Sequence, residues 1–259
     1  AQESRGLGDV YKRQTQVRAW LDWLGNRGYA RKTVANHLIV ITEIFAWACE
    51  HYNLLANPAT LVHVPDGLPR AKRTMPTAEE IAIIKENADT PDGLFFYFLL
   101  YTGLRRGEAL ALQWKDIDEE AGIIHVWRSL YYAGKNNGNF KEPKTEAGKR
   151  DVIYLDRLRD VLEPHRKADN CFVFGADAPM TYKKLGCLLS RYRSRTGIDV
   201  TPHQLRHAFA TLCFEADLPE KTAQGLLGHA QLSTTMDIYA ELRDRKRMEA
   251  AVALNAADF

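Results

Sequence analysis

Hydrophobic and polar positions alternate with helical spacing near the start of the chain. Apolar residues recur every three or four positions over residues 17–24 and again over residues 38–52, a pattern that predicts two amphipathic helices. Gly25 and Gly28 mark the end of the first helix. The stretch 57–76 contains four prolines. Proline interrupts helices, so this stretch predicts a linker after a small helical domain.

A second domain is predicted to begin at Thr77. Thr77 and Glu80 have the spacing of a capping box, in which each side chain binds the backbone N–H of the other residue at a helix start. The longest apolar run, GLFFYFLLYTGL at residues 93–104, is too short to cross a bilayer, which requires about 20 residues. This run therefore predicts a buried helix.

β-Branched and aromatic residues are concentrated in two stretches further along. GIIHVWRSLYY (122–132) and RDVIYL (150–155) flank a loop rich in Gly, Lys and Asn, and together they predict a hairpin or small sheet. From about residue 156 the spacing is helical again, with a break at CFVFGADAP (171–179). The expected fold is mainly α with one small antiparallel β-sheet, in the α+β class.

This pattern divides the chain into four parts. Residues 1–14 (AQESRGLGDVYKRQ) have no clear amphipathic pattern and resemble a translated adapter sequence at the end of an assembled reading frame. We therefore expect a non-native or disordered leader there, and a missing natural N-terminus. Residues 15–65 are expected to form the helical domain, residues 66–76 the linker, and residues 77–259 the larger domain with a C-terminal tail helix.

The composition is that of an ordinary globular protein. Of the 259 residues, 46% are hydrophobic and 26% are charged, and the formal net charge is +2, so charge alone gives weak support to a nucleic-acid partner. The four cysteines are scattered and form no CxxC pair, which argues against a zinc site or a disulfide framework and favours a reducing cytosolic setting. No secretory signal opens the chain.

The stretch TPHQLRHAFATL (201–212) begins with a strong helix start: a threonine cap, a proline at the first position and a glutamine at the third. His203, Arg206 and His207 share one face of this helix because they are spaced i, i+3 and i+4. Their place near the positive end of the helix dipole suits an anion site. A solvated polar face is the alternative.

The stretch YTGLRRGEALALQWKDID (101–118) carries a possible charge pair. Gly103 interrupts the apolar run, and Arg105 follows where a helix would restart. Arg105 and Glu108 are spaced for contact, so the carboxylate could hold the guanidinium in place. An ordinary ion pair within one helix is the alternative.

The stretch KEPKTEAGKRDVIYL (141–155) is basic. Lys144 is predicted to lie in a turn between two strands, with Lys141, Lys149 and Arg150 nearby. A mobile hairpin that carries a lysine can reach over a phosphate group. A solvated basic loop is the alternative reading of the whole stretch.

The stretch LGHAQLSTTMDIYAEL (227–242) places the pair Gly228 and His229 ten positions before a lone Tyr239. This tyrosine is either a half-buried residue on a terminal helix or a nucleophile. The stretch alone does not decide between the two.

Taken together in this order, the motifs resemble the tyrosine recombinases of the phage-integrase family, of the prophage or conjugative-transposon type. TGLRRGEALAL is similar to the first arginine motif of that family, HQLRHAFAT to its His-x-x-Arg motif, and LLGHAQLSTTMDIYA to its Gly-His and nucleophile motif. The similarity covers roughly residues 15–250. It implies a helical core-binding domain that clamps DNA and a tyrosine-recombinase catalytic domain, corresponding to the two domains above.

The resemblance implies roles in DNA strand cleavage. Tyr239 matches the nucleophile, which forms a 3′-phosphotyrosyl bond, and a phenoxide is both a good nucleophile and a fair leaving group. Arg105 and Arg206 match the two arginines that bind the non-bridging phosphate oxygens. The motif aligns to Arg105 rather than to the neighbouring Arg106, which we expect at the surface.

Five further residues complete the site that the resemblance implies. Lys144 matches the general acid for the 5′-oxygen, with the Lys-Thr pair favouring it over Lys141, and His203 matches the general base or proton shuttle. His229 matches the position that binds a phosphate oxygen and supports the tyrosine. Glu108 would orient the first arginine, and His207 would give structural support.

Other basic residues are candidates for phosphate contacts, which position a protein on DNA without reading its sequence. These candidates are Arg31, Lys32, Arg70, Lys72, Arg73, Lys183, Lys184 and Arg191. Each is equally compatible with a solvated surface.

The resemblance also implies partners and location. We expect double-stranded DNA attachment sites, a homo-tetramer coupled through the C-terminal tail, and an excisionase or host DNA-bending protein as further candidates. No metal, cofactor or membrane is expected, and the location would be the cytoplasm, in association with the nucleoid. Two alternative functions are a type IB topoisomerase-like nicking and resealing enzyme and a catalytically silent DNA-binding regulator.

Overall fold

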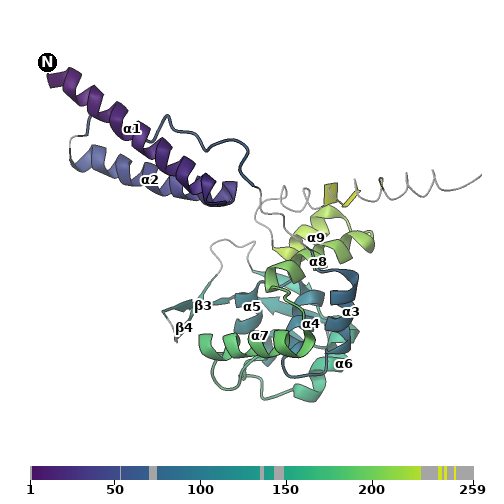
Figure 1. Ribbon diagram of the computed structural model, residues 1–259. Coiled ribbons are helices and arrows are strands. Elements are labelled where there is room, and N and C mark those ends of the chain that lie inside the picture. The colour runs from purple at the N-terminus through teal and green to yellow at the C-terminus, as the bar shows by residue number, and fades with distance from the viewer. Residues whose placement is uncertain are drawn as a thin grey trace, which may run out of the picture. The chain divides into compact units, whose positions relative to one another are not determined.

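The structure is a computed structural model. It describes residues 2–52, 54–69, 75–134, 137–142, 149–228, 239, 240, 242, 243 and 248. The chain divides into two compact units, Ala1–Arg73 and Thr74–Phe259, and each is described by itself (Figure 1). The division falls inside the range 66–76 that the sequence predicts as a linker.

The first unit contains the two predicted helices. α1 spans Gln2–Asn26 and α2 spans Arg31–His51, and the two pack against each other. Their shared core is formed by Val17, Leu21 and Leu24 of α1, by Val34 of α2, and by Val62 of the segment that follows α2. The predicted stripe over residues 17–24 is confirmed. In the stripe predicted over residues 38–52, Leu38, Ile41 and Phe45 pack against this core, whereas Tyr52 follows the end of α2 and is exposed.

The non-native or disordered leader predicted at residues 1–14 is helical in the structure, in which α1 begins at Gln2. Its non-native origin stays a prediction. This part of the helix depends on local bonds: the Thr15 hydroxyl donates to the Tyr11 carbonyl at 3.1 Å. Tyr11 is exposed. A helix that continues one already anchored at Val17 can extend without new core contacts, because propagation is much easier than nucleation.

The first helix of the second unit is α3. α3 spans Ala78–Glu86 and has a complete capping box, with the Thr77 N–H donating to Glu80 at 2.8 Å and the Glu80 N–H donating to Thr77 at 3.2 Å. α4 spans Gly93–Thr102, and every residue in it is buried. It packs against α8, which spans Pro202–Glu215, and also contacts α3 and α6 (Asp156–Leu162).

The β-structure forms two small antiparallel sheets. The first has the order β1 (Ile117–Asp118), β2 (Ile123–Val126), β5 (Arg150–Ile153). The second pairs β3 (Ser129–Ala133) with β4 (Asn137–Lys141). The predicted α+β class and the pairing of the two β-rich stretches are confirmed, since β2 pairs with β5.

The stretch 122–132 is not one strand but contributes to two sheets, whereas the sequence predicted a hairpin or one small sheet. Trp127 and Arg128 separate β2 from β3 because their side chains bind elsewhere. The Arg128 guanidinium donates to Asp116 at 2.8 Å and to the Ala111 carbonyl at 2.9 Å, and the Trp127 indole donates to the other oxygen of Asp116 at 2.9 Å. These side-chain bonds mark the point at which the chain passes from one sheet to the other.

The remaining elements surround this core. They are α5 (Arg106–Ala111), the 3-10 helices η1 (Trp114–Asp116) and η3 (Glu163–His165), α7 (Tyr182–Thr196) and α9 (Glu220–Leu227). α8 begins with the predicted capping box between Thr201 and Gln204. Within the described ranges, no helix is long and apolar enough to cross a membrane.

Candidate active site

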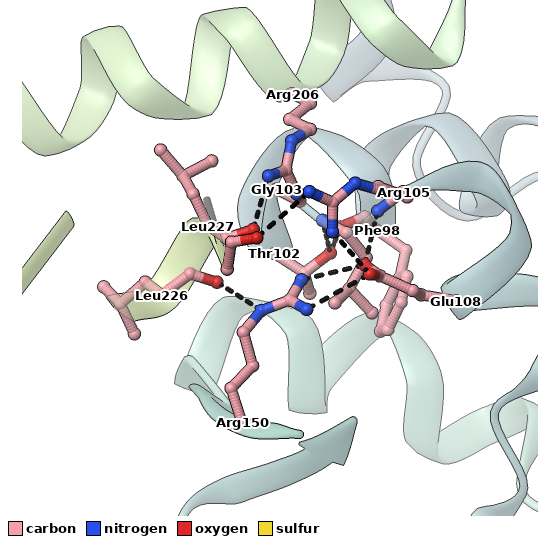
Figure 2. A network of polar contacts seen from close by, with 11 residues as sticks. Phe98, Thr102, Gly103, Arg105, Glu108, Arg150, Arg206, Leu226 and Leu227 are labelled. Carbon is pink, nitrogen blue, oxygen red and sulfur yellow. Dashed lines mark hydrogen bonds and ion pairs between the residues drawn. The ribbon is translucent and has the colours of Figure 1, made fainter. Parts of the chain in front are cut away.

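Two helices of the second unit end in left-handed glycines. Figure 2 shows Gly103, at one of these helix ends, beside a cluster of arginines. α4 ends at Gly103 and α9 ends at Gly228, each with φ of 62°. Glycine adopts this conformation without the steric cost that a Cβ atom would add. The Gly103 carbonyl accepts from Arg206 at 2.8 Å, and the Gly228 carbonyl accepts from Arg105 at 3.0 Å. Both helix ends thereby present backbone oxygens to the arginines.

Arg206 lies on α8 and is only 4% exposed. Its two terminal nitrogens donate to the carbonyls of Gly103 and Leu227. These carbonyls lie at the C-terminal ends of α4 and α9, where the helix dipole carries partial negative charge. Both acceptors are carbonyls rather than carboxylates. The positive charge of this guanidinium is therefore compensated by the dipoles of α4 and α9 and not by a bonded anion.

The electrostatic environment of Arg206 is that of an incompletely neutralised cation. Burial, together with the charges of Arg105 and Arg150, lowers the pKa of Arg206 to about 9, and the charge of Glu108 opposes this shift. A buried charge of this kind is costly unless it is paired. An anion that reaches it would therefore be bound strongly.

Arg105 and Glu108 make the contact that their spacing predicts. The Arg105 guanidinium donates to one oxygen of Glu108 at 2.9 Å, and the Arg105 backbone N–H donates to the other at 2.8 Å. The Arg105 side chain is 47% exposed, whereas that of Glu108 is 8% exposed. The buried carboxylate therefore fixes one side of a guanidinium that still reaches solvent.

Arg150 completes the cluster, although the sequence analysis did not assign it to the site. It is the first residue of β5, and its side chain is 5% exposed. It donates to both oxygens of Glu108, at 2.8 and 3.2 Å, and to the Leu226 carbonyl at 2.8 Å. The only sequence signal was its place at the start of the run RDVIYL, and the neighbouring basic residues suggested a solvated loop instead.

The charge state of Glu108 follows from these neighbours. Burial alone would raise its pKa, but the hydrogen bonds and charges of Arg150 and Arg105 outweigh burial and hold the pKa below its ordinary value. Glu108 is therefore ionised at neutral pH. Three guanidinium groups surround this one carboxylate, so the cluster keeps a net positive charge suited to an anion such as a phosphate.

His203 and His207 lie one helical turn apart on α8. Their Nε2 atoms are 3.1 Å apart, and their rings meet edge to face with centroids 4.6 Å apart. His203 is exposed and His207 is half-buried. The structure brings the two imidazoles together, while Arg206 on the same helix points into the buried cluster (Figure 2).

Tyr239 lies in a different environment from the arginines. It is 2% exposed and belongs to an apolar cluster with Phe209, Cys213 and Leu227. Its hydroxyl donates to the Leu218 carbonyl at 3.4 Å. Burial raises its pKa to about 12, with the nearby Cys213 and Glu220 adding to the effect. The structure therefore holds this side chain as a neutral phenol.

The remaining predicted site residues fall into two groups. The first group lies outside the described residues and consists of Lys144, His229, Arg70, Lys72 and Arg73.

The second group consists of described basic residues that take no part in the hydrogen bonds of the arginine cluster. Lys32, Lys183, Lys184 and Arg191 are exposed. Arg31 is half-buried, donates to the Pro65 carbonyl at 3.2 Å and lies 3.7 Å from Asp66. Among the described residues, no group of three or more His, Cys, Asp or Glu side chains is placed to bind a metal ion.

Replacing Gly228 by alanine is expected to destabilise the cluster. The new Cβ would lie 2.8 Å from the Arg150 Nη1 atom, and the residue has φ of 62°. A non-glycine residue in this conformation costs about 1–2 kcal/mol, and Arg150 must also shift. We expect the free energy of unfolding to fall by about 2 kcal/mol or more in urea titrations.

Gly225→Ala is the matched control for this prediction. Gly225 lies in the same helix, and nothing lies within 4 Å of the place that a Cβ would occupy there. Alanine is a better helix former than glycine by about 0.5–1 kcal/mol, so this variant should be at least as stable as the wild type. Equal stability of the two variants would contradict the packing described for Gly228.

The pKa of Tyr239 predicts a specific dependence of stability on pH. Its value of about 12 lies above the ordinary value of 10, so the folded state favours the neutral phenol. The resulting stabilisation is complete below pH 10 and is lost as the pH rises from about 10 to about 12. We expect the free energy of unfolding of the wild type to fall more steeply over this range than that of Tyr239→Phe.

Urea titrations of both proteins from about pH 9 to about pH 12 would measure this difference. Tyr154 and Tyr192 also have their pKa raised to about 12 by burial. They titrate equally in both proteins and cancel in the difference. The difference therefore reports Tyr239 together with the neighbouring Cys213, whose pKa burial also raises to about 12. Parallel curves would show that the hydroxyl is not buried in solution.

Comparison with known proteins extends these observations. The model of the phage integrase family matches residues 72–246. Among curated proteins, the tyrosine recombinase XerD of Ralstonia nicotianae is 29% identical over 273 residues, covering 94% of this chain and 86% of that protein. A XerC-like tyrosine recombinase of Caldanaerobacter subterraneus is 28% identical, covering 93% of this chain and 70% of that protein.

Solved structures have the same fold. The integrase of the transposon Tn1549, in complex with a circular intermediate DNA, matches with a TM-score of 0.70 at 22% identity and covers 92% of this chain and 85% of that chain. A lambda integrase dimer bound to a core site matches with a TM-score of 0.64 at 18% identity, over 87% of this chain and 79% of that chain.

Proposed function

The chain belongs to the phage integrase family, and from this premise we propose that its arginine cluster binds the DNA phosphate that Tyr239 attacks. The protein is a tyrosine recombinase that cleaves and rejoins DNA at specific sites. The observation that carries the proposal is the net positive cluster of Arg105, Arg150, Arg206 and Glu108, in which backbone carbonyls fix the two family arginines.

Arg105 and Arg206 bind the two non-bridging oxygens of the phosphodiester. Guanidinium groups are suited to this because they remain charged and donate planar pairs of hydrogen bonds. Their attachment to helix ends through Gly103 and Gly228 supports this role, since the donors are oriented before the substrate arrives. Donors that are oriented in advance stabilise the charge that develops in the transition state.

Tyr239 supplies the nucleophile. Its phenolic oxygen attacks the phosphorus, the bond from phosphorus to the 5′-oxygen breaks, and the 3′-phosphate remains attached to the tyrosine. Lys144 donates a proton to the departing 5′-oxygen, and His203 accepts the phenolic proton. The 5′-hydroxyl of a second strand then attacks the phosphotyrosine, which restores the tyrosine and rejoins the DNA.

Tyr239 must leave its apolar cluster before it reacts. Its hydroxyl bonds to Leu218, and its pKa of about 12 leaves little phenoxide at neutral pH. Movement toward Arg105 and Arg206 would place it among cations, which favour the phenoxide. His229 lies on the same segment of the protein chain as Tyr239. It binds a phosphate oxygen of the DNA and supports the tyrosine in its reactive position.

DNA and further copies of the chain are the proposed partners. Exposed basic residues of both units, among them Lys32, Lys183, Lys184 and Arg191, support contacts with phosphates of a double-stranded attachment site. Four protomers act together on two paired sites, coupled through the C-terminal tail. An excisionase or a DNA-bending protein joins this assembly, which acts on mobile DNA associated with the nucleoid.

Formation of a covalent adduct tests the function. The protein is incubated, in EDTA, with nicked duplexes built from the ends of the mobile element that carries its gene. The nick lets a short fragment diffuse away after cleavage, so that the intermediate accumulates. An SDS-resistant adduct that maps to the Tyr239 peptide supports the proposal. Sequence-specific binding without an adduct would overturn it, and relaxation of supercoiled plasmid without strand exchange would indicate a topoisomerase instead.

A further inference from the structure

Arg150 connects parts of the site that are far apart in the sequence. From the start of β5 it binds Glu108, 42 residues earlier, and the Leu226 carbonyl, 76 residues later. Figure 2 shows its guanidinium between these two partners, beside the guanidinium of Arg105. All three nitrogens of its guanidinium donate to Glu108 or to the Leu226 carbonyl, so its donors are directed at these protein partners.

Two routes lead from Arg150 to the arginines that bind phosphate. The first passes through Glu108, which receives hydrogen bonds from both Arg150 and Arg105. The second passes through the end of α9: Arg150 binds the Leu226 carbonyl, and the next two carbonyls, of Leu227 and Gly228, accept from Arg206 and Arg105.

The contact with Gly228 makes the second route rigid. Three atoms of the Arg150 side chain lie within 2.8–2.9 Å of the place where a Cβ of residue 228 would be. The end of α9 is therefore pressed against the guanidinium as well as bonded to it. Any change in the position of Arg150 shifts the carbonyls on which the other arginines depend.

From this geometry we propose that Arg150 is a positioning residue for strand cleavage, which sets the placement of Arg105 and Arg206 through Glu108 and the end of α9. The proposal rests on the function proposed above for the cluster. Arg150 acts through Arg105 and Arg206 and does not itself touch the DNA. Lysine cannot replace it fully, because a single ammonium group lacks the planar fork that serves a carboxylate and a carbonyl together.

The first test compares rates of covalent cleavage in a single turnover. Arg150→Met is expected to lose about 100-fold, the scale that follows when reacting groups are misplaced by about 1 Å. Arg150→Lys is expected to lose less, because it keeps the charge. Arg157→Met, which replaces an exposed arginine of α6, is the matched control and should cleave at the wild-type rate. A wild-type rate for Arg150→Met would overturn the proposal.

A modified substrate separates positioning of the arginines from general disruption. A methylphosphonate at the scissile position has lost one negative charge, so it depends less on correctly placed arginines. On this substrate the deficit of Arg150→Met is expected to shrink by about tenfold or more. An equal deficit on both substrates would mean that Arg150 supports the fold or the tyrosine segment, and the proposal would be wrong.

A spectroscopic readout makes the outcome independent of activity. The Nε–H signals of Arg105 and Arg206, assigned in protein labelled with ¹⁵N-arginine, are expected to shift in Arg150→Lys and to stay in place in Arg157→Met. Unchanged signals would overturn the proposal even if cleavage fails. If the wild type forms no adduct, the function is wrong, and shifted signals would still establish the positioning role within the cluster. Arg150→Lys serves both tests if Arg150→Met does not fold.

Discussion

Tyr239→Phe is expected to abolish the covalent protein–DNA adduct and to lower strand cleavage by a factor on the order of 10⁴–10⁶, the scale seen when a nucleophile is removed from other enzymes. The substitution removes only the hydroxyl, whose bond to the Leu218 carbonyl is a long 3.4 Å. The aromatic ring keeps its edge-to-face contact with Phe214. DNA binding and the fold should therefore persist.

Tyr192→Phe is the control for this prediction. Tyr192 is 1% exposed, and its hydroxyl has no hydrogen-bond partner among the described residues. Removal of this hydroxyl should leave cleavage unchanged and should not lower stability, because an unsatisfied buried polar group is lost. The measurement is single-turnover adduct formation on a nicked duplex, with binding followed in parallel. An adduct that persists in Tyr239→Phe would assign the nucleophile to another residue.

Arg206→Ala is expected to lower the cleavage rate by about 10³–10⁵, as does the loss of an arginine that stabilises a phosphoryl transition state elsewhere. Arg206→Lys should be nearly as inactive. A lysine keeps the charge, but its single ammonium group cannot reproduce the two-pronged contact with the carbonyls of Gly103 and Leu227. Binding of DNA should weaken far less than cleavage, because many other cations contribute to affinity.

Arg195→Ala is the control for Arg206. Arg195 is more exposed than Arg206, and its partners are Asp92, Asn87 and Thr90, so its bonds join α7 to the turn before α4. This variant should lose stability, visible as a lower melting temperature, and yet cleave at the wild-type rate per folded molecule. If Arg195→Ala lost cleavage as severely as Arg206→Ala, general destabilisation would explain both.

Local signals in the sequence predicted the helices well. The capping boxes at Thr77 and Thr201 are present, and the apolar run at residues 93–104 forms the buried α4 as far as Thr102. The contact between Arg105 and Glu108 also follows from spacing alone, since the residues are three positions apart. In each case the interaction lies within a few residues of the chain, where propensity and periodicity determine the outcome.

The features that the sequence did not predict depend on distant partners. The division between β2 and β3 arises because Arg128 binds Asp116 and Ala111 outside the strand. Arg150 lies in the cluster because its partners are 42 and 76 residues away. The burial of Tyr239 likewise depends on the apolar surfaces of α8 and α9. No local pattern contains this information.

The acceptors around the arginine cluster have a practical consequence for mutagenesis. The carbonyls of Gly103, Leu226, Leu227 and Gly228 belong to the backbone, so an alanine scan cannot remove them and would underestimate half of the site. Amide-to-ester replacement at the residue after each carbonyl, introduced by semisynthesis or by hydroxy-acid incorporation, would weaken that oxygen as an acceptor while preserving every side chain. These acceptors are consequently determined by the course of the main chain rather than by the identity of any side chain.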